Sequence, residues 1–449
     1  MKIINYLMIA GLIFSGMLYS CSQKTDYQEA LNGNEYLIQA NQKATDIMVH
    51  DIFSPPVASR VYAYASLAAY EVAVLADPEF SSLMGQLNGF EEKTFDTSKE
   101  CLYPLASLAA YYQVAGSMIF SELDMIDHRD KMYQFIKGKG IPQDIFQNSL
   151  LLGEEVAKHI LAYASKDSYH QSRSYEQFTS STDAGAWKPT PPVYQAGLEP
   201  HWAKIRPFVL DSASQFAPDK PSPFDIIPKS NFYKEAEAVM LATNQITPEQ
   251  REIAFFWDCN PFKMNITGHV MYAEKKITPG GHWMGIAGIA AKAKELDWKE
   301  TAEVFAITSL AVFDGFISCW DEKYRSVLIR PETYINEYMD ENWMPLLQTP
   351  PFPEYTSGHS VISTAAAVAL TALMGDEVHI VDSTEVVFGL PIREFDSFEQ
   401  AAEEAAISRF YGGIHYMPAI ENGAEQGRMV GEWIINSVKT RNHLAAKTE

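Results

Sequence analysis

Three short groups of polar residues near the C-terminus carry side chains that could bind one small anion. In chain order they are Lys323-x6-Arg330-Pro331, Ser357-Gly358-His359 and Ser408-Arg409-x5-His415. Arginine gives forked, charge-assisted hydrogen bonds to oxyanions, and lysine adds a compact point charge. With two imidazoles, hydroxyl groups and a glycine amide added, the inventory suits a tetrahedral oxyanion such as phosphate or vanadate. The presence of all three groups in this order supports the inference, since each group alone is weak evidence for an oxyanion site.

The spacing of the first group predicts that its two cations share one face of a helix. Lys323 and Arg330 are seven residues apart, close to two helical turns, so a helix would direct both side chains to one place. Trp320 lies three residues before Lys323 on the same face. Pro331 then lets the chain leave the helix. Taken alone, the group is better interpreted as a solvated basic stripe.

The second and third groups each stand at an expected helix end. Ser357-Gly358-His359 precedes an apolar helix expected at 361–374, whose first turn offers free N–H groups and the positive end of the helix dipole. Arg409 and His415 would lie on different sides of one straight helix. Gly412-Gly413 between them lets the helix end, so that His415 can turn back. The blander interpretation of both groups is a helix cap.

Helical periodicity dominates the rest of the chain and predicts an all-α fold. The expected helices are 40–75, 103–125, a pair within 130–165, 248–257, 282–295, 299–325, 361–374, 397–411 and one near 422–438. Residues 378–387 are the one short candidate for a strand. The proline-rich segment 168–230 indicates a long irregular connection that lies over the helical body.

Composition limits the partners of the chain. It has 449 residues, of which 47% are hydrophobic and 20% charged, with a formal net charge of −22. A chain this acidic is unsuited to nucleic acid or anionic membrane surfaces, both of which require a basic face. Three cysteines beyond Cys21, at wide spacings, predict neither a disulfide framework nor a CxxC zinc site. A metal site at His269 and His282 is not favoured, because neither the spacing nor a nearby acid completes a ligand set.

Residues 1–21 have the pattern of a targeting segment. Lys2 gives a short basic start, and residues 6–19 are nearly all apolar or small. This run is too short to span a bilayer comfortably, so a cleaved signal is expected. Leu18-Tyr19-Ser20-Cys21 resembles the bacterial lipobox, which would make Cys21 the lipidated N-terminus of an exported cell-envelope lipoprotein. The alternative is an ordinary signal peptide in which Cys21 is incidental.

The three polar groups resemble the fingerprint shared by vanadium-dependent haloperoxidases and the type 2 phosphatidic acid phosphatase superfamily. The pattern matches except at Thr356, where the family has proline. The resemblance implies a single α-helical catalytic domain at 22–449, built from two four-helix-bundle-like halves at about 35–230 and about 231–440. Segment 350–359 is especially similar to bacterial iodide-oxidising peroxidases.

The resemblance also implies a role for each matched residue. His415 would bind the vanadium of a vanadate cofactor axially, and His359 would act as an acid–base catalyst toward hydrogen peroxide. Lys323 would polarise the peroxide for attack by halide. The residues implied to hold the vanadate oxygens are Lys323, Arg330, Ser357, Gly358 and Arg409. Residues implied or considered for the halide side of the pocket are Trp320, Phe352 and Phe262.

Alternative functions remain open from the residues alone. Vanadate resembles the transition state of phosphoryl transfer, so an acid phosphatase could use His415 as nucleophile and His359 as leaving-group acid. A surface-tethered binding lipoprotein with an inactive site is a further class. Chain length, export signal and aromatic positions favour a haloperoxidase that oxidises iodide. Bromide is a weaker second choice, because related bromoperoxidases tend to place a histidine where Phe352 stands. The sequence does not define an oligomeric state.

Overall fold

The computed structural model describes Tyr27, residues 29–267 and residues 269–442. Its longer helices are α2 (Glu35–His50), α3 (Pro55–Ala76), α4 (Tyr103–Gly116), α5 (Glu122–Lys137), α6 (Gln143–Ala164), α8 (Asn231–Asn244), α9 (Pro248–Phe256), α10 (Pro279–Ala293), α11 (Trp298–Ser326), α12 (Pro331–Tyr338), α13 (Gly358–Met374), α14 (Phe398–Tyr411) and α15 (Met417–Ser437). The predicted signal segment 1–21, with Cys21, lies outside the described residues. The all-α prediction is confirmed.

The shorter elements lie in the connections between these helices. They are α7 (Tyr169–Ser172), η1 (Trp202–Lys204), η2 (Val386–Phe388) and the strands β1 (Met264–Thr267), β2 (Val270–Ala273), β3 (Ile380–Asp382) and β4 (Arg393–Phe395). β1 pairs antiparallel with β2, and β3 with β4, as two separate hairpins. These hairpins add local structure to loops, so the body of the molecule is helical.

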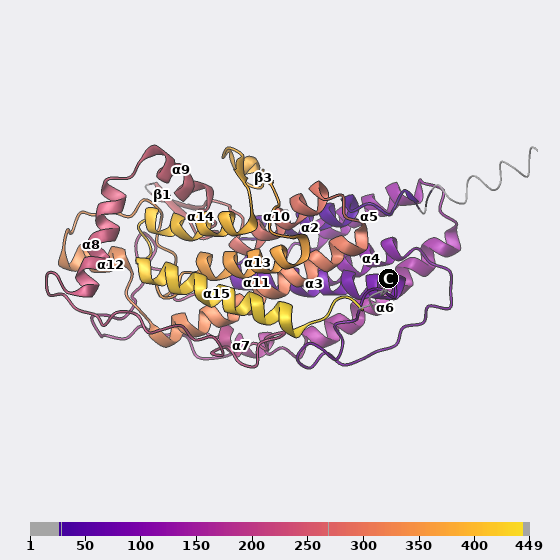
Figure 1. The fold of residues 1–449 in the computed structure, drawn as a ribbon, viewed down its shortest axis with the longest axis horizontal. Coiled ribbons are helices and arrows are strands. Elements are labelled where there is room, and N and C mark those ends of the chain that lie inside the picture. Colours follow the sequence, from indigo (N-terminus) through magenta and orange to yellow (C-terminus); the bar gives the residue numbers. More distant parts are fainter. Residues whose placement is uncertain (1–26, 28, 268, 443–449) are drawn as a thin grey trace, which may run out of the picture.

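Helix α11 joins the two ends of the molecule. It packs against α3 on the N-terminal side and against α13 on the C-terminal side. α4 contacts α3 and α6, whereas α13 contacts α14 and α15. In Figure 1, α4 and α6 lie toward one end of the long axis, and α8 and α12 lie together at the other. Within the described part of the chain, α11 alone is long and apolar enough to cross a membrane, and its apolar stretch is fully buried in the fold.

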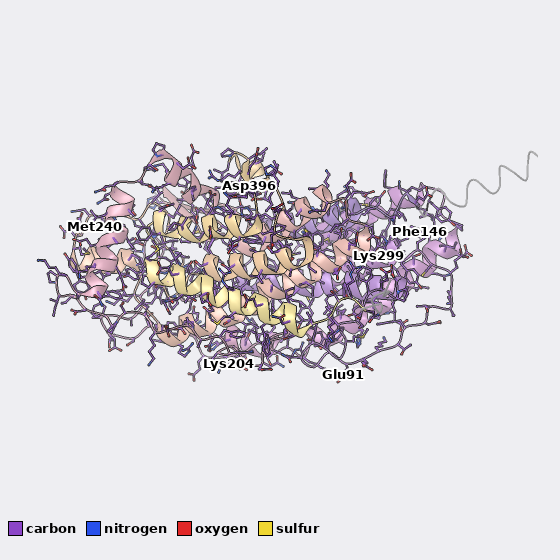
Figure 2. All side chains as sticks on the ribbon, in the orientation of Figure 1. Glu91, Phe146, Lys204, Met240, Lys299 and Asp396 are labelled. Carbon is purple, nitrogen blue, oxygen red and sulfur yellow. The ribbon has the colours of Figure 1, made fainter. Side chains whose placement is uncertain are left out.

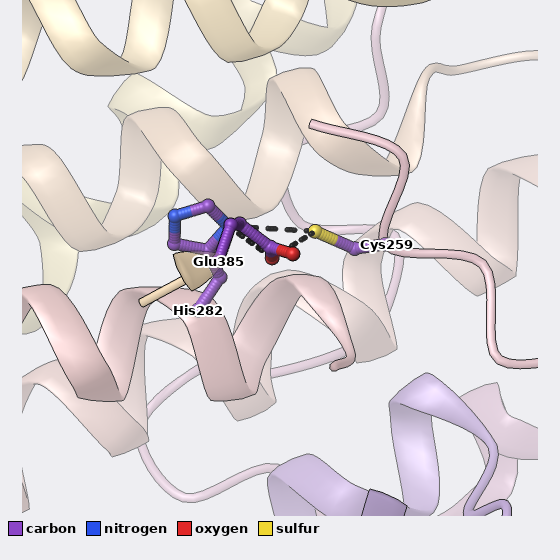
Figure 3. A group of neighbouring side chains, drawn as sticks. All are labelled: Cys259, His282 and Glu385. Atoms are coloured by element: carbon purple, nitrogen blue, oxygen red, sulfur yellow. Dashed lines mark hydrogen bonds and ion pairs between the residues drawn. The ribbon is translucent and has the colours of Figure 1, made fainter. Parts of the chain in front are cut away.

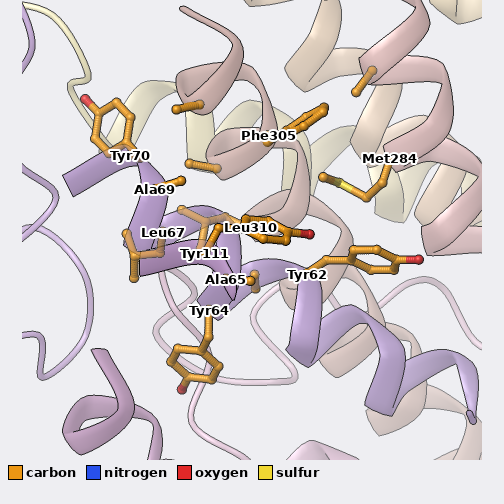
Figure 4. Close-up of a cluster of buried hydrophobic side chains, with 14 of the residues drawn as sticks. Tyr62, Tyr64, Ala65, Leu67, Ala69, Tyr70, Tyr111, Met284, Phe305 and Leu310 are labelled. Carbon is orange, nitrogen blue, oxygen red and sulfur yellow. The ribbon is translucent and has the colours of Figure 1, made fainter. Parts of the chain in front are cut away.

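One large cluster of buried apolar side chains joins α2 to α6 with α10, α11 and α13 to α15, whereas α8 and α12 pack in a separate cluster that contains Phe232 and Tyr334. Figure 4 shows where Tyr62 and Tyr70 of α3, Tyr111 of α4, Met284 of α10 and Leu310 of α11 lie in the large cluster. Side chains fill the spaces between the ribbons along the whole molecule (Figure 2). The large cluster therefore connects the N-terminal helices with α13, whose first turn carries the second polar group. The predicted division near residue 230 stays a prediction.

The sequence predictions were wrong in several details. The predicted helix 40–75 is two helices, because Pro55 and Pro56 begin α3 and exclude a helix that continues from α2. The predicted helix 103–125 likewise ends at Gly116. Helices α8 and α12 and the β1–β2 hairpin were not predicted. The predicted strand 378–387 contains β3 but continues into η2.

Candidate active site

The three polar groups meet where several helices end. Lys323 lies near the C-terminus of α11 and Arg409 near that of α14, while Ser357 is the N-cap of α13. His415 lies in the turn between α14 and α15. Its Nε2 atom is 3.1 Å from the guanidinium NH1 of Arg330, which confirms that the first and third groups converge.

Arg330 reaches the site by a different route from the one predicted. Helix α11 ends at Ser326, where the next residue, Val327, adopts the left-handed conformation with φ of 49°. Arg330 is therefore not on the helix that carries Lys323 but is the extended N-cap of α12, with Pro331 at the first helical position. Its Nε donates to the carbonyl of Phe352 at 3.0 Å and its NH1 to that of Ile414 at 2.8 Å. The loop, and not helical pitch, brings the two cations together.

The ammonium of Lys323 holds the loop that leads into α13. It donates to the carbonyls of Pro353, Glu354 and Thr356 at 3.0, 3.0 and 2.5 Å. Burial lowers the pKa of Lys323 to about 7, and the Arg330 cation acts in the same direction. Thr356, which replaces the family proline, uses its hydroxyl to donate to Oε1 of Gln426 at 2.6 Å. The substitution thus adds an anchor to this loop.

The second group forms the first turn of α13, which begins at Gly358 and so earlier than predicted. The Ser357 hydroxyl accepts a hydrogen bond from the Ser360 N–H at 3.3 Å. Nε2 of His359 is buried and has no hydrogen-bond partner among the described residues. Burial and the Arg409 cation hold the pKa of His359 well below its usual range. The side chain is therefore a neutral imidazole with a free nitrogen.

The double glycine turns the third group back on itself, as predicted. α14 ends at Tyr411, and Gly413 takes the left-handed conformation with φ of 76°. Arg409 donates from NH1 to the carbonyl of Trp257 at 2.8 Å. Its Nε is buried with no acceptor in the described part of the chain. Arg409 therefore keeps a charged donor available for a ligand.

Two neighbours fix the tautomer of His415. Arginine can only donate, so Nε2 of His415, which faces NH1 of Arg330, must carry the lone pair. The ring proton then lies on Nδ1, which donates to Oε1 of Glu354 at 2.8 Å. Burial, followed by the Arg330 and Lys323 cations, holds the pKa of His415 well below its usual range. His415 is thus a neutral nitrogen ligand with its lone pair on Nε2.

Glu354 is the residue of this site that the sequence analysis missed. Its carboxylate also accepts from the backbone N–H of Tyr416 at 3.0 Å, and burial raises its pKa to about 7. The signal that could have found it is its position, because it is an acidic residue three positions before Ser357 in an otherwise apolar stretch. A carboxylate that orients a ligating imidazole is a recurrent feature of metal sites.

The site holds more positive than negative charge. Lys323, Arg330 and Arg409 are all buried, and none of them pairs with a carboxylate within the residues described. NH2 of Arg330 and Nε of Arg409 both lack acceptors there. Buried charges are costly unless paired. The arrangement therefore requires an anion with several oxygens, which vanadate or phosphate would supply.

Aromatic side chains close the other side of this site. A small cavity of about 30 Å³ is bounded by His359, Arg409 and His415 on its polar side. Trp320, Phe352 and Phe262 all line it, and their role on the halide side stays a prediction. The Phe352 ring centre lies 5.1 Å from that of Trp320 and also 5.1 Å from Nζ of Lys323. The cations thus face an apolar wall, which strengthens their interactions with an anion.

This fold and site place the chain in a known family. A family model described as the VCPO second helical-bundle domain matches residues 336–443. A solved relative is 49% identical, and the alignment covers 92% of this chain and 98% of the relative. The chain therefore belongs to the vanadium-dependent haloperoxidase family. That relative is the first bacterial vanadium-dependent iodoperoxidase, and its crystal structure matches this fold with a TM-score of 0.87.

More distant structures share the fold. The holo form of a bacterial vanadium-dependent chloroperoxidase is 15% identical with a TM-score of 0.68, over 91% of this chain and 98% of that one. An apo form is 16% identical with a TM-score of 0.65, over 86% of this chain and 95% of that one. No curated protein matches the chain. The halide preference must therefore be argued from the site itself and the 49% identical relative.

Proposed function

We propose that this protein is a vanadate-dependent haloperoxidase that oxidises iodide with hydrogen peroxide to a hypohalous species. The observation that carries the proposal is the state of His415, whose ring proton lies on Nδ1 and whose Nε2 atom faces Arg330. Nε2 bears the lone pair of the ring, which accepts a hydrogen bond from the buried Arg330 in this structure, and a bond to vanadium would replace that hydrogen bond. A neutral imidazole nitrogen in a strongly cationic pocket is suited to an oxyanion whose central atom accepts a nitrogen ligand. The solved relative with 49% identity is an iodoperoxidase, which supports the same halide.

The unsatisfied donors of the site define how vanadate would be held. NH2 of Arg330 and Nε of Arg409 would donate to its oxygens, since both are buried without other acceptors among the described residues. Ser357 and the Gly358 amide stand at the N-terminus of α13, where the helix dipole favours negative charge. Lys323, which holds the loop that leads into α13, would add a third positive charge. Phosphate would satisfy the same donors, so anion binding alone does not choose the reaction.

His359 and the cations are the protein groups that would transfer a proton and stabilise charge in the reaction. When bound, vanadate supplies a Lewis-acid centre that activates hydrogen peroxide without a change in oxidation state. His359, neutral because of its lowered pKa, would accept a proton from the incoming peroxide at Nε2. Lys323 and Arg330 would stabilise the negative charge that remains. Trp320 and Phe352 would keep water from the side that iodide approaches.

The reaction class can be decided with one purified preparation. Triiodide formation from iodide and peroxide is measured with and without added vanadate, beside hydrolysis of a chromogenic phosphate ester. We expect vanadate-dependent iodide oxidation that is lost in His415→Ala. Ester hydrolysis without vanadate-dependent triiodide formation would instead establish an acid phosphatase. Chloride and bromide, tested in the same vanadate-loaded sample, should react more slowly than iodide, and efficient bromination would contradict the proposed halide preference.

We also propose that the chain is exported and held at the cell envelope by a lipid on Cys21. The support is the lipobox-like Leu18-Tyr19-Ser20-Cys21 after a short apolar run. Labelled palmitate should enter the wild-type protein and be absent from Cys21→Ala. Labelling that persists in the variant would exclude this anchor and leave an ordinary signal peptide.

A further inference from the structure

Three potential metal ligands from distant parts of the chain face one another beside the active site. Cys259 follows α9, His282 lies in the first turns of α10, and Glu385 follows β3 (Figure 3). All three side chains are buried, with exposed fractions of 2%, 0% and 4%. The sequence did not favour a metal site at His269 and His282, because neither the spacing nor a nearby acid completed a ligand set. The fold corrects this, because it brings two acids from the β3 region to His282, whereas His269 is exposed elsewhere.

The orientation of His282 leaves one nitrogen for the centre of this cluster. Its Nε2 lies 2.7 Å from Oδ2 of Asp382. Asp382 is itself oriented by the N–H and hydroxyl of Thr384, at 2.9 and 2.7 Å. The imidazole also stacks on Trp257, with ring centres 4.4 Å apart. A carboxylate behind a histidine in this way fixes the tautomer and the ring orientation of a metal ligand.

Two of the three separations between the donor atoms match the edges of a tetrahedral metal site, and the third is slightly longer. Nδ1 of His282 lies 3.5 Å from Sγ of Cys259 and 3.4 Å from Oε1 of Glu385. The Cys259 and Glu385 atoms are 4.0 Å apart. Metal–ligand bonds of about 2.0–2.3 Å at tetrahedral angles give ligand–ligand separations of roughly 3.3–3.8 Å. The N···O distance of 3.4 Å between His282 and Glu385 is longer than a direct N–H···O hydrogen bond of about 2.7–3.2 Å, whereas the two contacts of the Cys259 sulfur fit a hydrogen bond or a metal site.

We propose that Cys259, His282 and Glu385 bind one divalent transition-metal ion of the zinc class, with Asp382 as the residue that positions His282. Thiolate, imidazole and carboxylate are the ligand types that zinc takes in proteins. Together the thiolate and carboxylate neutralise a dication in this buried place. The three donors leave one tetrahedral position for water or another small ligand.

Such an ion would support the wall of the active site. It would tie α10 and the segment after β3 to the segment that runs from Trp257 to Cys259. That segment supplies the carbonyl that accepts from NH1 of Arg409, and Cys259 itself lines the active-site cavity. Metal binding therefore stabilises the fold and holds Arg409 in place, independently of the reaction that the site performs.

Metal content tests the proposal without any assay of activity. The protein is stripped with chelator, reloaded with Zn²⁺ in the absence of vanadate, dialysed and analysed for zinc. We expect one zinc per chain and a Tm raised by several degrees. Cys259→Ser and Glu385→Gln should lose the zinc, and Asp382→Asn should weaken its binding by about 10–100-fold. Cys101→Ser, which changes a thiol remote from the cluster, is the matched control and should retain it.

Cobalt provides a second measurement that folding defects cannot imitate. Co²⁺ bound at this cluster should show a thiolate-to-cobalt charge-transfer band in wild type and Cys101→Ser. The band should be absent from Cys259→Ser, even where its helical circular dichroism is unchanged. Wild-type protein that retains no zinc would overturn the proposal in favour of a hydrogen-bonded triad only. Equal zinc content in wild type, Cys259→Ser and Glu385→Gln would overturn it as well.

Discussion

Oε1 of Glu354 lies 2.8 Å from Nδ1 of His415, on the side of the imidazole opposite Arg330. This contact sets which nitrogen of His415 carries the proton and therefore which one is free to bind a ligand. Glu354 is held in turn by the N–H of Tyr416, and its own backbone carbonyl accepts from Lys323. One acidic residue thus connects the proposed vanadium ligand with one of the cations that surround it.

Replacing Glu354 should weaken vanadate binding without unfolding the protein. In Glu354→Ala, His415 loses the acceptor for its Nδ1 proton, so its free nitrogen is no longer fixed on the cavity side. We expect the dissociation constant for vanadate, measured by equilibrium titration, to rise by about 10–100-fold. Glu354→Gln retains a carbonyl oxygen and should recover part of the loss. Equal affinities of wild type and Glu354→Ala would show that this contact does not orient the ligand.

The forked side chain of Arg409, and not only its charge, should contribute to vanadate affinity. Arg409→Lys keeps a cation but removes the Nε donor that has no other acceptor in the described structure. A hydrogen bond to a charged group contributes about 1.5–3 kcal/mol, so vanadate affinity should fall by roughly tenfold to a hundredfold. Arg428→Lys on α15, where the arginine is partly exposed, is the matched control. The prediction fails if both variants bind vanadate as wild type does.

Vanadate affinity should fall as the pH rises because of Lys323. Burial lowers the pKa of Lys323 to about 7, so above that pH its amine is neutral in the free protein. An anion favours the ammonium, hence binding then requires uptake of a proton, and affinity falls by up to about tenfold per pH unit. Lys323→Gln should lack this component.

The difference between wild type and Lys323→Gln in the pH dependence of vanadate affinity isolates the contribution of Lys323. The protonation of vanadate itself changes with pH but is common to both titrations. Affinities should therefore be compared on both sides of the pKa of about 7. Identical pH slopes for wild type and Lys323→Gln would mean that Lys323 does not titrate in this range.

The turn at Gly413 should be necessary for the position of His415. Gly413 has φ of 76°, and an added Cβ would lie 2.9 Å from the Thr243 hydroxyl and 3.2 Å from Pro345. Gly413→Ala should lower the free energy of unfolding by about 1–3 kcal/mol and also weaken vanadate binding. Gly389→Ala is the matched control, because Gly389 has φ of 83° with open space around it. It should lose stability but keep wild-type affinity, and a similar loss of affinity in both variants would contradict the role of the turn.

The composition of the site could be predicted from sequence more readily than its local geometry. Charged side chains and glycines in fixed order indicate an oxyanion pocket, and Gly412-Gly413 correctly indicated that His415 turns back. Arg330 was assigned to the wrong helix, because periodicity does not reveal that Val327 ends α11 in a left-handed conformation. The position of Glu354 before Ser357 is a local signal, but its pairing with His415 and the cluster at His282 depend on contacts between residues far apart in the chain, which no local pattern encodes.

A crystal structure of the protein loaded with vanadate would test the central claim most directly. We expect vanadium bonded to Nε2 of His415, with Arg330 and Arg409 donating to the vanadate oxygens. Nδ1 of His415 should still face Glu354. Vanadate bound away from His415, or bonded to it through Nδ1, would contradict the account.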